Sequence, residues 1–394
     1  VVLLLDGLTL TSADTAPILC GESTGVTIAV VDGTENTLTD SEANDPDNAA
    51  DNENAEKAVV KCKDGSQVVL CGGGALTVNA LGKNGIKSGT ALDDRDASLT
   101  IRELTLNIEA LVNDAINAEQ RLKVESGNLT IAAGEDAIHC DMELNIGAEG
   151  TTGPAITVSS CSEGLEGAIL NIHSGNMDIT STDDCLNAAN SDLGDYAFEI
   201  NISGGTIKAY SSEGDGFDSN GTMTITGGDI SVWTANAADN QPLDADGRIT
   251  ISGGTVLAAG GSAGMGFSIS ASQPYVTFGG GRDSSLSLAG GEAFSIADES
   301  GKSVLDSTAL CDAAFLFYSS PALTAEGRYS VQSTVTATAK TGEADPQFGG
   351  NGGPGGSGGQ RPDGMTPSDG QMPQGQPPQS DGTTPPELPA ASSN

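Results

Sequence analysis

The chain has 394 residues, of which 54 are glycine and only 4% are aromatic, and its formal net charge at pH 7 is −38. A globular domain of this length normally carries more large apolar residues. The acidic charge argues against nucleic acid and anionic membranes as direct partners, and it favours metal cations or partners bridged by them. No apolar run is long enough to insert into a membrane.

The first residues have the pattern of a strand within a first coil, which occupies residues 1–31. The apolar run VVLLL at 1–5 is too short for a signal peptide and has no basic residue before it. We therefore expect that an N-terminal part, with any secretion signal, is missing from this chain. Residues 32–56 hold nine acidic residues and no basic one. They are predicted to leave the coil as a solvated loop, with a cation site as the alternative.

Residues 57–260 repeat one pattern of short strands and glycine corners, most regularly after residue 132. Between 197 and 260 the corners are Gly204-Gly205, Gly227-Gly228 and Gly253-Gly254, so the period is 23 to 26 residues. A period in this range predicts a solenoid, and the alternation of apolar and polar residues predicts strands. The predicted fold is all-β: a parallel β-helix, right-handed because parallel crossovers nearly always are.

One apolar turn residue in each coil, called the anchor here, is predicted to point inward. It should stack about 4.8 Å from the anchor of the next coil. The anchors are Ile18, Val60, Ile86, Ile116, Ile138, Leu165, Leu186, Phe217 and Leu243.

The seven cysteines are too few for a disulfide scaffold, and no CxxC motif indicates zinc. Cys20 and Cys62 each follow an anchor by two residues, so in register they lie within disulfide range. The spacing leaves two alternatives open, a Cys20–Cys62 bridge or a pair of stacked thiols. Cys140 is expected to be a buried thiol.

The C-terminal third changes character. Residues 261–344 keep strand patterns at 274–278, 285–288 and 329–338 without the repeat, and we interpret them as terminal coils and a cap. Residues 345–394 contain 12 Gly and 10 Pro and cannot bury enough surface to fold alone. The predicted domains are therefore a β-helix at 1–344 and a low-complexity tail at 345–394.

Two polar rows flank the anchors, and together they are called the acidic edge here. Two residues before the anchors stand Asn84, Asp114, Asp136, Glu163, Asp184, Asp215 and Gln241. One residue after the anchors stand Lys87, Asn117, His139, Glu166, Asn187, Asp218 and Asp244. Carboxylates at this spacing repel by about 1 kcal/mol per pair in water. Residues 134–247 hold 20 acids and one base, Lys208, so bound Ca²⁺ is the favoured neutraliser, with a solvated edge as the alternative.

Several segments resemble a family of secreted carbohydrate-binding domains of clostridia and their relatives. They include DGTENTLTD (32–40), EDAIHCDMELNI (135–146), SEGLEG (162–167), TDDCLNAAN (182–190), GDGFDSNGTMTITGGDI (214–230), LDADGRITISGGTVLAAG (243–260) and the Gly/Pro/Met/Gln tail. The resemblance implies a pectate-lyase-like β-helix, outside the cell or at its surface, that binds calcium and plant cell-wall polysaccharide. From the two rows and the resemblance, the candidate Ca²⁺ ligands are Asp114, Asp136, Asp141, Glu163, Glu166, Asp183, Asp184, Asp215, Asp218, Asp244 and Asp246.

Three functions remain open at this point. A carbohydrate-binding protein without enzymatic activity is favoured, and its partner is an acidic or cellulosic polysaccharide. A calcium-dependent lyase needs a base near the metal, and Lys208 and Arg248 are the candidates, although each has the pattern of a surface charge. A filament subunit that associates end to end is the third. His139 is predicted to be an exposed turn residue, with contact to a metal ligand as the alternative. Aromatic candidates for stacking on sugar rings are Tyr196, Tyr210, Trp233 and Tyr275, with packing at the coil edge as the alternative for Trp233.

Overall fold

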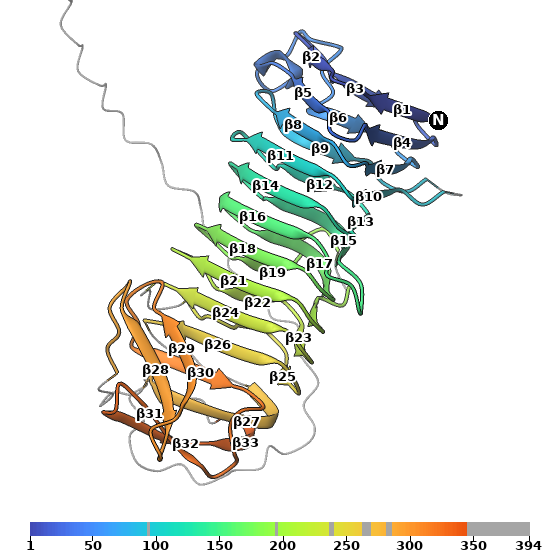
Figure 1. Cartoon of the computed structure of the whole chain (residues 1–394). Helices are drawn as coiled ribbons and strands as arrows, with labels where there is room; N and C mark the ends of the chain where they lie inside the picture. Colours follow the sequence, from blue (N-terminus) through green and yellow to red (C-terminus); the bar gives the residue numbers. More distant parts are fainter. Residues whose placement is uncertain (93–94, 194–195, 236–239, 262–268, 281–285, 345–394) are drawn as a thin grey trace, which may run out of the picture. The chain divides into compact units, whose positions relative to one another are not determined.

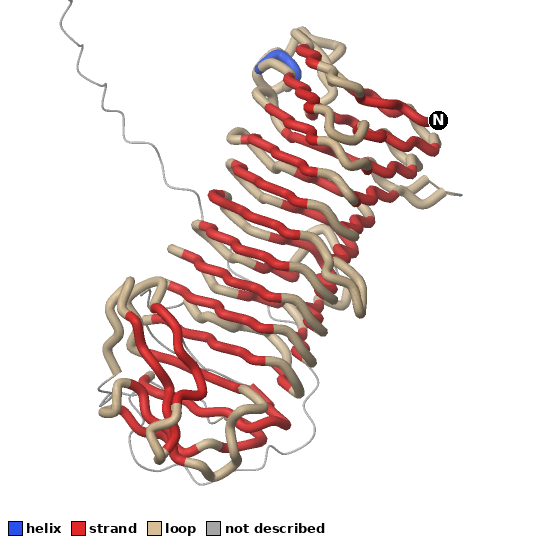
Figure 2. Tube along the Cα trace, viewed as in Figure 1, coloured by secondary structure: helices blue, strands red, loops and turns tan. Residues whose placement is uncertain are grey.

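The computed structural model describes residues 1–344 apart from 93–94, 194–195, 236–239, 262–268 and 281–285. Within them the chain winds into a parallel β-solenoid, which confirms the predicted all-β fold class (Figure 1). Among the described residues the one helical element is a short 3-10 turn, η1 (Glu42–Asn44), coloured blue in Figure 2. No helix in the described part is both long and apolar enough to span a membrane. The predicted tail, 345–394, lies outside the described residues.

Each full coil contributes strands to three rows, and neighbours within a row pair in parallel. The first row, which carries the anchors, contains β3 (Ile18–Cys20), β6 (Ala58–Cys62), β9 (Asn84–Ser88), β12 (Ile116–Ala118), the starts of β15 (Ile138–Ile146) and β17 (Leu165–Ile172), β19 (Leu186–Ala188) and β22 (Phe217–Ser219).

The second row contains β1 (Val2–Leu5), β4 (Gly25–Val30), β7 (Gln67–Cys71), β10 (Ser98–Arg102), β13 (Arg121–Val124), the ends of β15 and β17, β20 (Glu199–Ile202), β23 (Thr222–Ile225), β25 (Ile249–Ile251) and the start of β27 (Ile269–Gly279). The third row contains β2 (Thr9–Thr11), β5 (Glu35–Thr39), β8 (Ala75–Asn79), β11 (Thr105–Ala110), β14 (Asn128–Ala133), β16 (Ala155–Ser160), β18 (Asn176–Ser181), β21 (Thr206–Ser211), β24 (Asp229–Thr234) and β26 (Thr255–Gly260).

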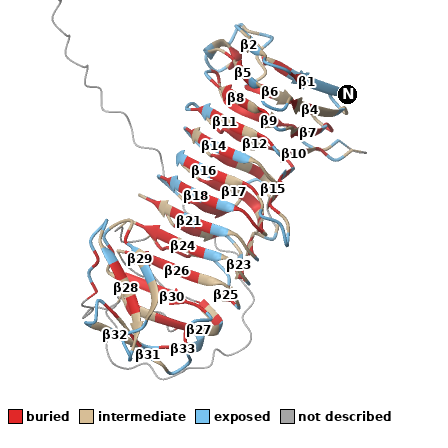
Figure 3. Cartoon of the chain, viewed as in Figure 1, coloured by how far each residue is buried: buried red, intermediate tan, exposed pale blue. Residues whose placement is uncertain are grey.

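The anchors stack as predicted. Every step of the series, from Ile18 on Val60 to Phe217 on Leu243, is a register pair of neighbouring coils. All nine anchors are buried in one continuous core, and buried and exposed residues alternate along the strands in Figure 3. Each buried Val, Ile or Leu contributes about 1.5–3 kcal/mol, so this thin column supplies what a globular core otherwise would.

The Gly-Gly corners are dictated by the tight stacking of coils. A Cβ on Gly204 would lie 2.3 Å from the carbonyl oxygen of His173 in the coil before. Its neighbour Gly205 has φ +91°, a left-handed conformation that side chains other than glycine rarely adopt. One corner position therefore requires glycine for space and the next requires it for backbone conformation.

The prediction of a loop over 32–56 is wrong for its first part. β5 lies there, in register with β8, and buries Asn36 and Leu38. The apolar–polar alternation of β5 is hard to recognise in the sequence for two reasons. The outward positions and the flanking turns carry acids, and one inward position is the polar residue Asn36. Asn36 satisfies its buried amide by accepting from Leu8 N (2.8 Å) and donating to Thr34 Oγ1 (3.0 Å). The excursion begins only after Asp40, and it returns to the solenoid at β6.

The cysteine register is confirmed, since Cys20 pairs with Cys62, and both side chains are buried. Both are free thiols in the structure, so the bridge is not formed and the alternative of stacked thiols holds. Cys140 is buried as expected.

Beyond β26, apart from the parallel start of β27, the strands pair in antiparallel fashion, and a second core forms. β30 (Phe315–Ser319) pairs with β26 and β27, and β33 (Lys340–Glu343) also pairs with β27. A separate sheet contains β28 (Ala293–Asp298), β29 (Ser303–Thr308), β31 (Arg328–Val331) and β32 (Val335–Thr338). The predicted strand 329–338 is thus two strands. At 285–288 the prediction is wrong for the described residues, because Leu288 makes only an isolated bridge to Ala313.

Candidate cation and carbohydrate sites

The acidic edge exists as predicted along the first row of strands. Its residues after the anchors are register partners, from Lys87 and Asn117 through His139 to Asn187 and Asp218. Three acids before the anchors, Asp114, Asp184 and Asp215, accept a hydrogen bond from a backbone amide of the following coil. Asp114 Oδ1 accepts from the Asp136 amide (3.2 Å), and Asp184 Oδ1 accepts from the Asp215 amide (2.6 Å). These carboxylates therefore also have a structural role as caps of the next turn.

The middle of the edge is organised around His139. Its Nδ1 lies 3.0 Å from Asp136 Oδ2 and 2.7 Å from Glu166 Oε2, and its Nε2 lies 2.9 Å from Asp141 Oδ1. We call these four residues the His139 cluster. The side chain of His139 is 22% exposed, so the prediction of an exposed turn residue is wrong. The histidine lies instead among the candidate ligands themselves.

The protonation of the His139 cluster follows from these contacts. Burial alone lowers the pKa of His139, but its three carboxylate partners outweigh burial and raise that pKa to about 12. Burial raises the pKa of Asp136 to about 6, opposed by its bond to His139. At neutral pH the imidazole is therefore charged, and both ring nitrogens donate. The cluster carries its own cation.

Two coils further on, three carboxylates meet without such a cation. Oxygens of Asp215, Asp218 and Asp244 all lie within 4.8 Å of one another, and these residues form the Asp218 cluster. No ion pair of the described residues includes any of the three. Burial, followed by the neighbouring carboxylates, raises the pKa of Asp215 to about 7 and that of Asp218 to about 6.

Two neutral oxygens near the Asp218 cluster are buried without a hydrogen-bond partner. They are Asn187 Oδ1 and Gln241 Oε1, in side chains that are 9% and 4% exposed. Asn187 is the register partner of Asp218, and the backbone amide of Gln241 donates to Asp215 Oδ1. A buried unpartnered oxygen costs roughly 1–3 kcal/mol, which a bound cation or water would recover.

The remaining candidate ligands lie outside both clusters. Asp184 has its pKa raised to about 8, first by burial and then by the carboxylates of Asp183, Asp215 and Asp218. Glu163 accepts from Asn187 Nδ2 (2.8 Å), and burial raises its pKa to about 7. The others placed on the edge but in neither cluster are Asp114, Asp183 and Asp246.

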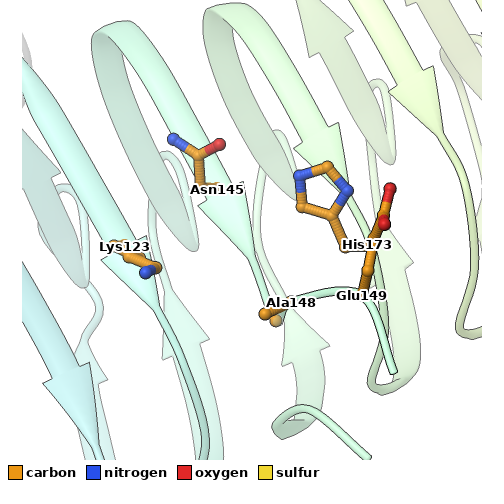
Figure 4. A pocket seen from close by; sticks show the side chains of 6 residues that line it. Lys123, Asn145, Ala148, Glu149 and His173 are labelled. Carbon is orange, nitrogen blue, oxygen red and sulfur yellow. The ribbon is translucent and has the colours of Figure 1, made fainter. Parts of the chain in front are cut away.

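A polar feature of the second row was missed from the sequence. Asn145, Asn171 and Asn201 are register partners on β15, β17 and β20, and we call them the amide ladder. Beside the ladder lies a groove of about 490 Å³, in which Figure 4 shows Lys123 and Asn145 on neighbouring strands and Glu149 beside His173. The recurring LNI, LNI and INI triplets that carry the three asparagines were the signal available.

Comparison with known proteins places this solenoid in a family. Residues 1–266 match the model of a family described as carbohydrate-binding domain-containing protein. The chain belongs to that family. A carbohydrate-binding domain-containing protein of Acetivibrio thermocellus is 34% identical over 101 residues, which are 26% of this chain and 34% of that protein. The match thus spans about a third of the relative's length. No solved structure matches the chain.

The two bases weighed for a lyase are engaged away from the acidic edge of this carbohydrate-binding domain protein. Lys208 Nζ lies 3.1 Å from Asp178 Oδ2 on the third row, as their register pairing requires. Arg248 Nη1 lies 2.8 Å from Glu343 Oε1 near the last coils. Asp178 is exposed on its strand, as the period-two pattern predicted.

Two of the four aromatic candidates for sugar stacking are buried, and for Trp233 the alternative of packing at the coil edge holds. Trp233 is fully buried against the cap, with its ring 6.0 Å from that of Phe294, and Tyr275 is 3% exposed and stacked on Phe317. Trp233 is covered by the second core, whereas Tyr275 lies in the main core at the end of the solenoid. Tyr196 and Tyr210 are partly exposed.

Proposed function

We propose that this protein is an extracellular or cell-surface carbohydrate-binding protein that holds Ca²⁺ on its acidic edge and binds plant cell-wall polysaccharide without cleaving it. The observation that carries the calcium part is the Asp218 cluster, where three partly buried carboxylates converge and no basic side chain of the described residues forms an ion pair with them. Membership of a carbohydrate-binding family supports the ligand class.

The donor set fits calcium rather than a transition metal. The Asp218 cluster offers carboxylate oxygens, and the unpartnered amide oxygens of Asn187 and Gln241 lie on the same edge. Calcium takes six to eight oxygen ligands, including carboxylates and amide carbonyls, whereas zinc favours nitrogen and sulfur. Asp215, Asp218 and Asp244 would hold the ion directly. A bound ion would also remove the repulsion that raises their pKa values.

Calcium would serve this protein in two ways. It would neutralise part of an edge that belongs to a chain of net charge −38, which otherwise repels an acidic polymer. Its open coordination positions would accept carboxylate or hydroxyl oxygens of the sugar. Acidic polysaccharide is therefore the ligand expected at the edge, and its binding should require the metal.

Binding without cleavage is supported by where the bases lie. Proton abstraction needs a base within hydrogen-bond reach of the substrate carbon beside the metal. Lys208 is on the third row and is paired with Asp178, while Arg248 is paired with Glu343. His139 is held by three carboxylates, and the raised pKa keeps it protonated. None of them supplies a free base at the Asp218 cluster.

Calcium titration by calorimetry on the parent, Asp215→Asn and Asp218→Asn tests the proposal. Each variant should lose at least tenfold in calcium affinity, about 1.4 kcal/mol, because it removes a ligand charge. Retention on immobilised polygalacturonate should fall in parallel, with no ultraviolet-absorbing unsaturated product from the parent.

Asp178→Asn is the matched control, because it removes the same charge from an exposed strand position. It should titrate like the parent. A parent that takes up no calcium, or cluster variants that bind it as tightly as the control, would refute the cation site. Time-dependent release of unsaturated product would refute the non-catalytic assignment.

A further inference from the structure

The groove beside the amide ladder is a second polar site, away from the acidic edge. Lys123 and Asn145 line it from strands β13 and β15, His173 lines it from just after β17, and the loop after β15 contributes Gly147, Ala148 and Glu149 (Figure 4). Asn145 and Asn171, and then Asn171 and Asn201, are register partners, so an amide recurs in three successive coils, about 4.8 Å from one to the next. This periodic array of hydrogen-bonding groups is suited to a periodic ligand.

The ladder is preorganised and still has capacity to bind. Asn171 Nδ2 donates to Asn145 Oδ1 (3.2 Å), and Asn201 Nδ2 donates to Asn171 Oδ1 (3.1 Å). A carbonyl oxygen has two lone pairs, so Asn145 and Asn171 each keep one for a further donor. Because the amides are already fixed in place, these asparagine side chains lose little conformational entropy when a ligand binds.

The charges around the ladder define what it can bind. Glu143 Oε1 accepts from Asn145 Nδ2 (3.1 Å), and Glu199 Oε2 accepts from Asn201 Nδ2 (3.0 Å), so carboxylates stand along the row. The lysine of the groove, Lys123, is already paired with Glu125 (2.9 Å). An anionic polymer would meet carboxylates here without a calcium ion to offset them. A ligand rich in hydroxyl donors and free of charge meets matching acceptors instead.

One wall of the groove is a loop that is held in place. The hydroxyl of Ser174 accepts from the Ala148 amide (3.1 Å) and donates to the Ala148 carbonyl (3.0 Å), and it also contacts Thr151 Oγ1 (3.0 Å). The wall therefore exists before any ligand arrives. Ala148, half-buried in this loop, presents only a methyl group toward the groove.

We propose that the groove and the amide ladder bind a neutral, extended polysaccharide chain without any metal ion, running across the coils so that successive sugars meet successive amides. This inference rests on the proposed carbohydrate-binding function and assigns the neutral ligand to a face other than the acidic edge. The protein then has two polysaccharide sites, one for acidic polymer with calcium and one for neutral polymer without it.

The third row supplies a matched comparison. Its groove of about 280 Å³ contains Asn107, which like the ladder asparagines is half-exposed on a parallel strand. The register neighbours of Asn107 are Thr77 and Thr130, so no amide stacks on it. Removal of this side chain changes an equivalent surface without touching the ladder.

The test measures binding of a soluble β-1,4-glucan oligosaccharide by calorimetry in the presence of chelator. The parent should bind, and Asn145→Ala combined with Asn171→Ala should weaken binding at least tenfold. Ala148→Trp, which fills the groove and leaves the ladder intact, should do the same. Asn107→Ala should bind like the parent. Thermal unfolding of each variant checks that the solenoid is folded.

The outcomes separate this inference from the function it rests on. If the parent binds the glucan and both groove variants bind it equally well, the groove is not the site. If the parent binds only polygalacturonate, and only with calcium, the neutral site is refuted while the proposed function stands. If the parent binds neither polymer in any condition, the carbohydrate-binding proposal itself fails.

Discussion

The His139 cluster and the Asp218 cluster occupy the same edge of the same solenoid, yet they balance charge in opposite ways. In the first, an imidazolium contacts Asp136, Glu166 and Asp141 at 2.7 to 3.0 Å. In the second, Asp218 stands in the row of His139, one residue after its anchor, and meets Asp215 and Asp244. At the position after the anchor, the first cluster has a base, His139, and the second has a further acid, Asp218.

That difference separates two roles of an acidic turn. Where the chain provides a cation, the carboxylates contribute to folding, because the ion cluster joins neighbouring coils. Where the chain provides no cation, such carboxylates have two ways to avoid repulsion. They can stay protonated, which makes stability depend on pH, or they can bind a cation from solution. An acidic row alone is therefore not enough to predict a metal site. The residue after the anchor must also be considered, because a base at that position neutralises the neighbouring carboxylates.

Replacing the internal cation should produce the largest effect. His139→Ala leaves three carboxylates without their partner, and loss of one member of a buried ion pair costs about 3–5 kcal/mol. Because His139 is 22% exposed, solvent screening reduces this to about 2–3 kcal/mol of unfolding free energy. Denaturant unfolding in chelator measures it. Calcium should then stabilise the variant more than the parent, because the variant has gained a second cluster without a cation.

His173→Ala serves as the control for that experiment. It removes the other histidine, whose Nδ1 lies 3.0 Å from the Ser203 hydroxyl, and should change the free energy of unfolding by less than about 0.5 kcal/mol. Equal losses for the two histidine variants would show that the His139 cluster does not hold the coils together.

The second effect is pH dependence in chelator. The folded-state pKa values of Asp184 (about 8), Asp215 (about 7) and Asp218 (about 6) exceed the unfolded value of about 3.9. The folded state therefore binds more protons, and stability should fall as pH rises from about 4 to about 8, by about 1–2 kcal/mol after screening. His139 adds to this loss above about pH 6.5, because its raised folded-state pKa keeps it protonated while the unfolded histidine loses its proton.

Thermal unfolding at pH 5 and pH 8, with chelator and with calcium, checks this dependence. Protons compete with calcium for the same oxygens, so the gain in melting temperature from calcium should be larger at pH 8. A melting temperature in chelator that rises between pH 5 and pH 8 would contradict the raised pKa values of Asp184, Asp215 and Asp218.

The solenoid could be predicted from the sequence because each repeat carries its own strand pattern and glycine corner. Anchors such as Phe217 and Leu243 recur with glycine corners at nearly fixed spacing, and stacking follows from that spacing alone. The same reasoning placed both rows of the acidic edge. It could not separate them into clusters, because the contacts of His139 reach across coils and depend on side-chain direction.

The misses share a physical cause. β5 was overlooked because Asn36, a buried polar residue, breaks the apolar alternation that marks a strand. The amide ladder was overlooked because a lone asparagine on a strand has no meaning until its register partner is known. The two alternatives for Trp233 could not be separated, because the antiparallel cap that covers it has no repeat from which its position could be predicted.

The smallest effect concerns Asn187, which stands in register between Glu166 of the His139 cluster and Asp218. Its Nδ2 donates to Glu163 (2.8 Å), while its Oδ1 is buried without a partner. Asn187→Ala loses a hydrogen bond but also removes an unsatisfied oxygen, so unfolding in chelator should change by less than about 1 kcal/mol. If Oδ1 contributes to the calcium site, calcium affinity should fall about threefold, roughly 0.6 kcal/mol.

Asn117 makes the comparison sharp, because it holds the same place in the row and both ends of its amide are partnered. Its Nδ2 donates to Asp114 Oδ2 (2.6 Å), and its Oδ1 accepts from Lys87 Nζ (2.7 Å). Asn117→Ala should therefore cost more stability in chelator than Asn187→Ala, yet leave calcium affinity unchanged. Calorimetric titration of both variants decides the question. If calcium affinity falls equally in both, or in neither, the unpartnered oxygen of Asn187 has no part in the metal site.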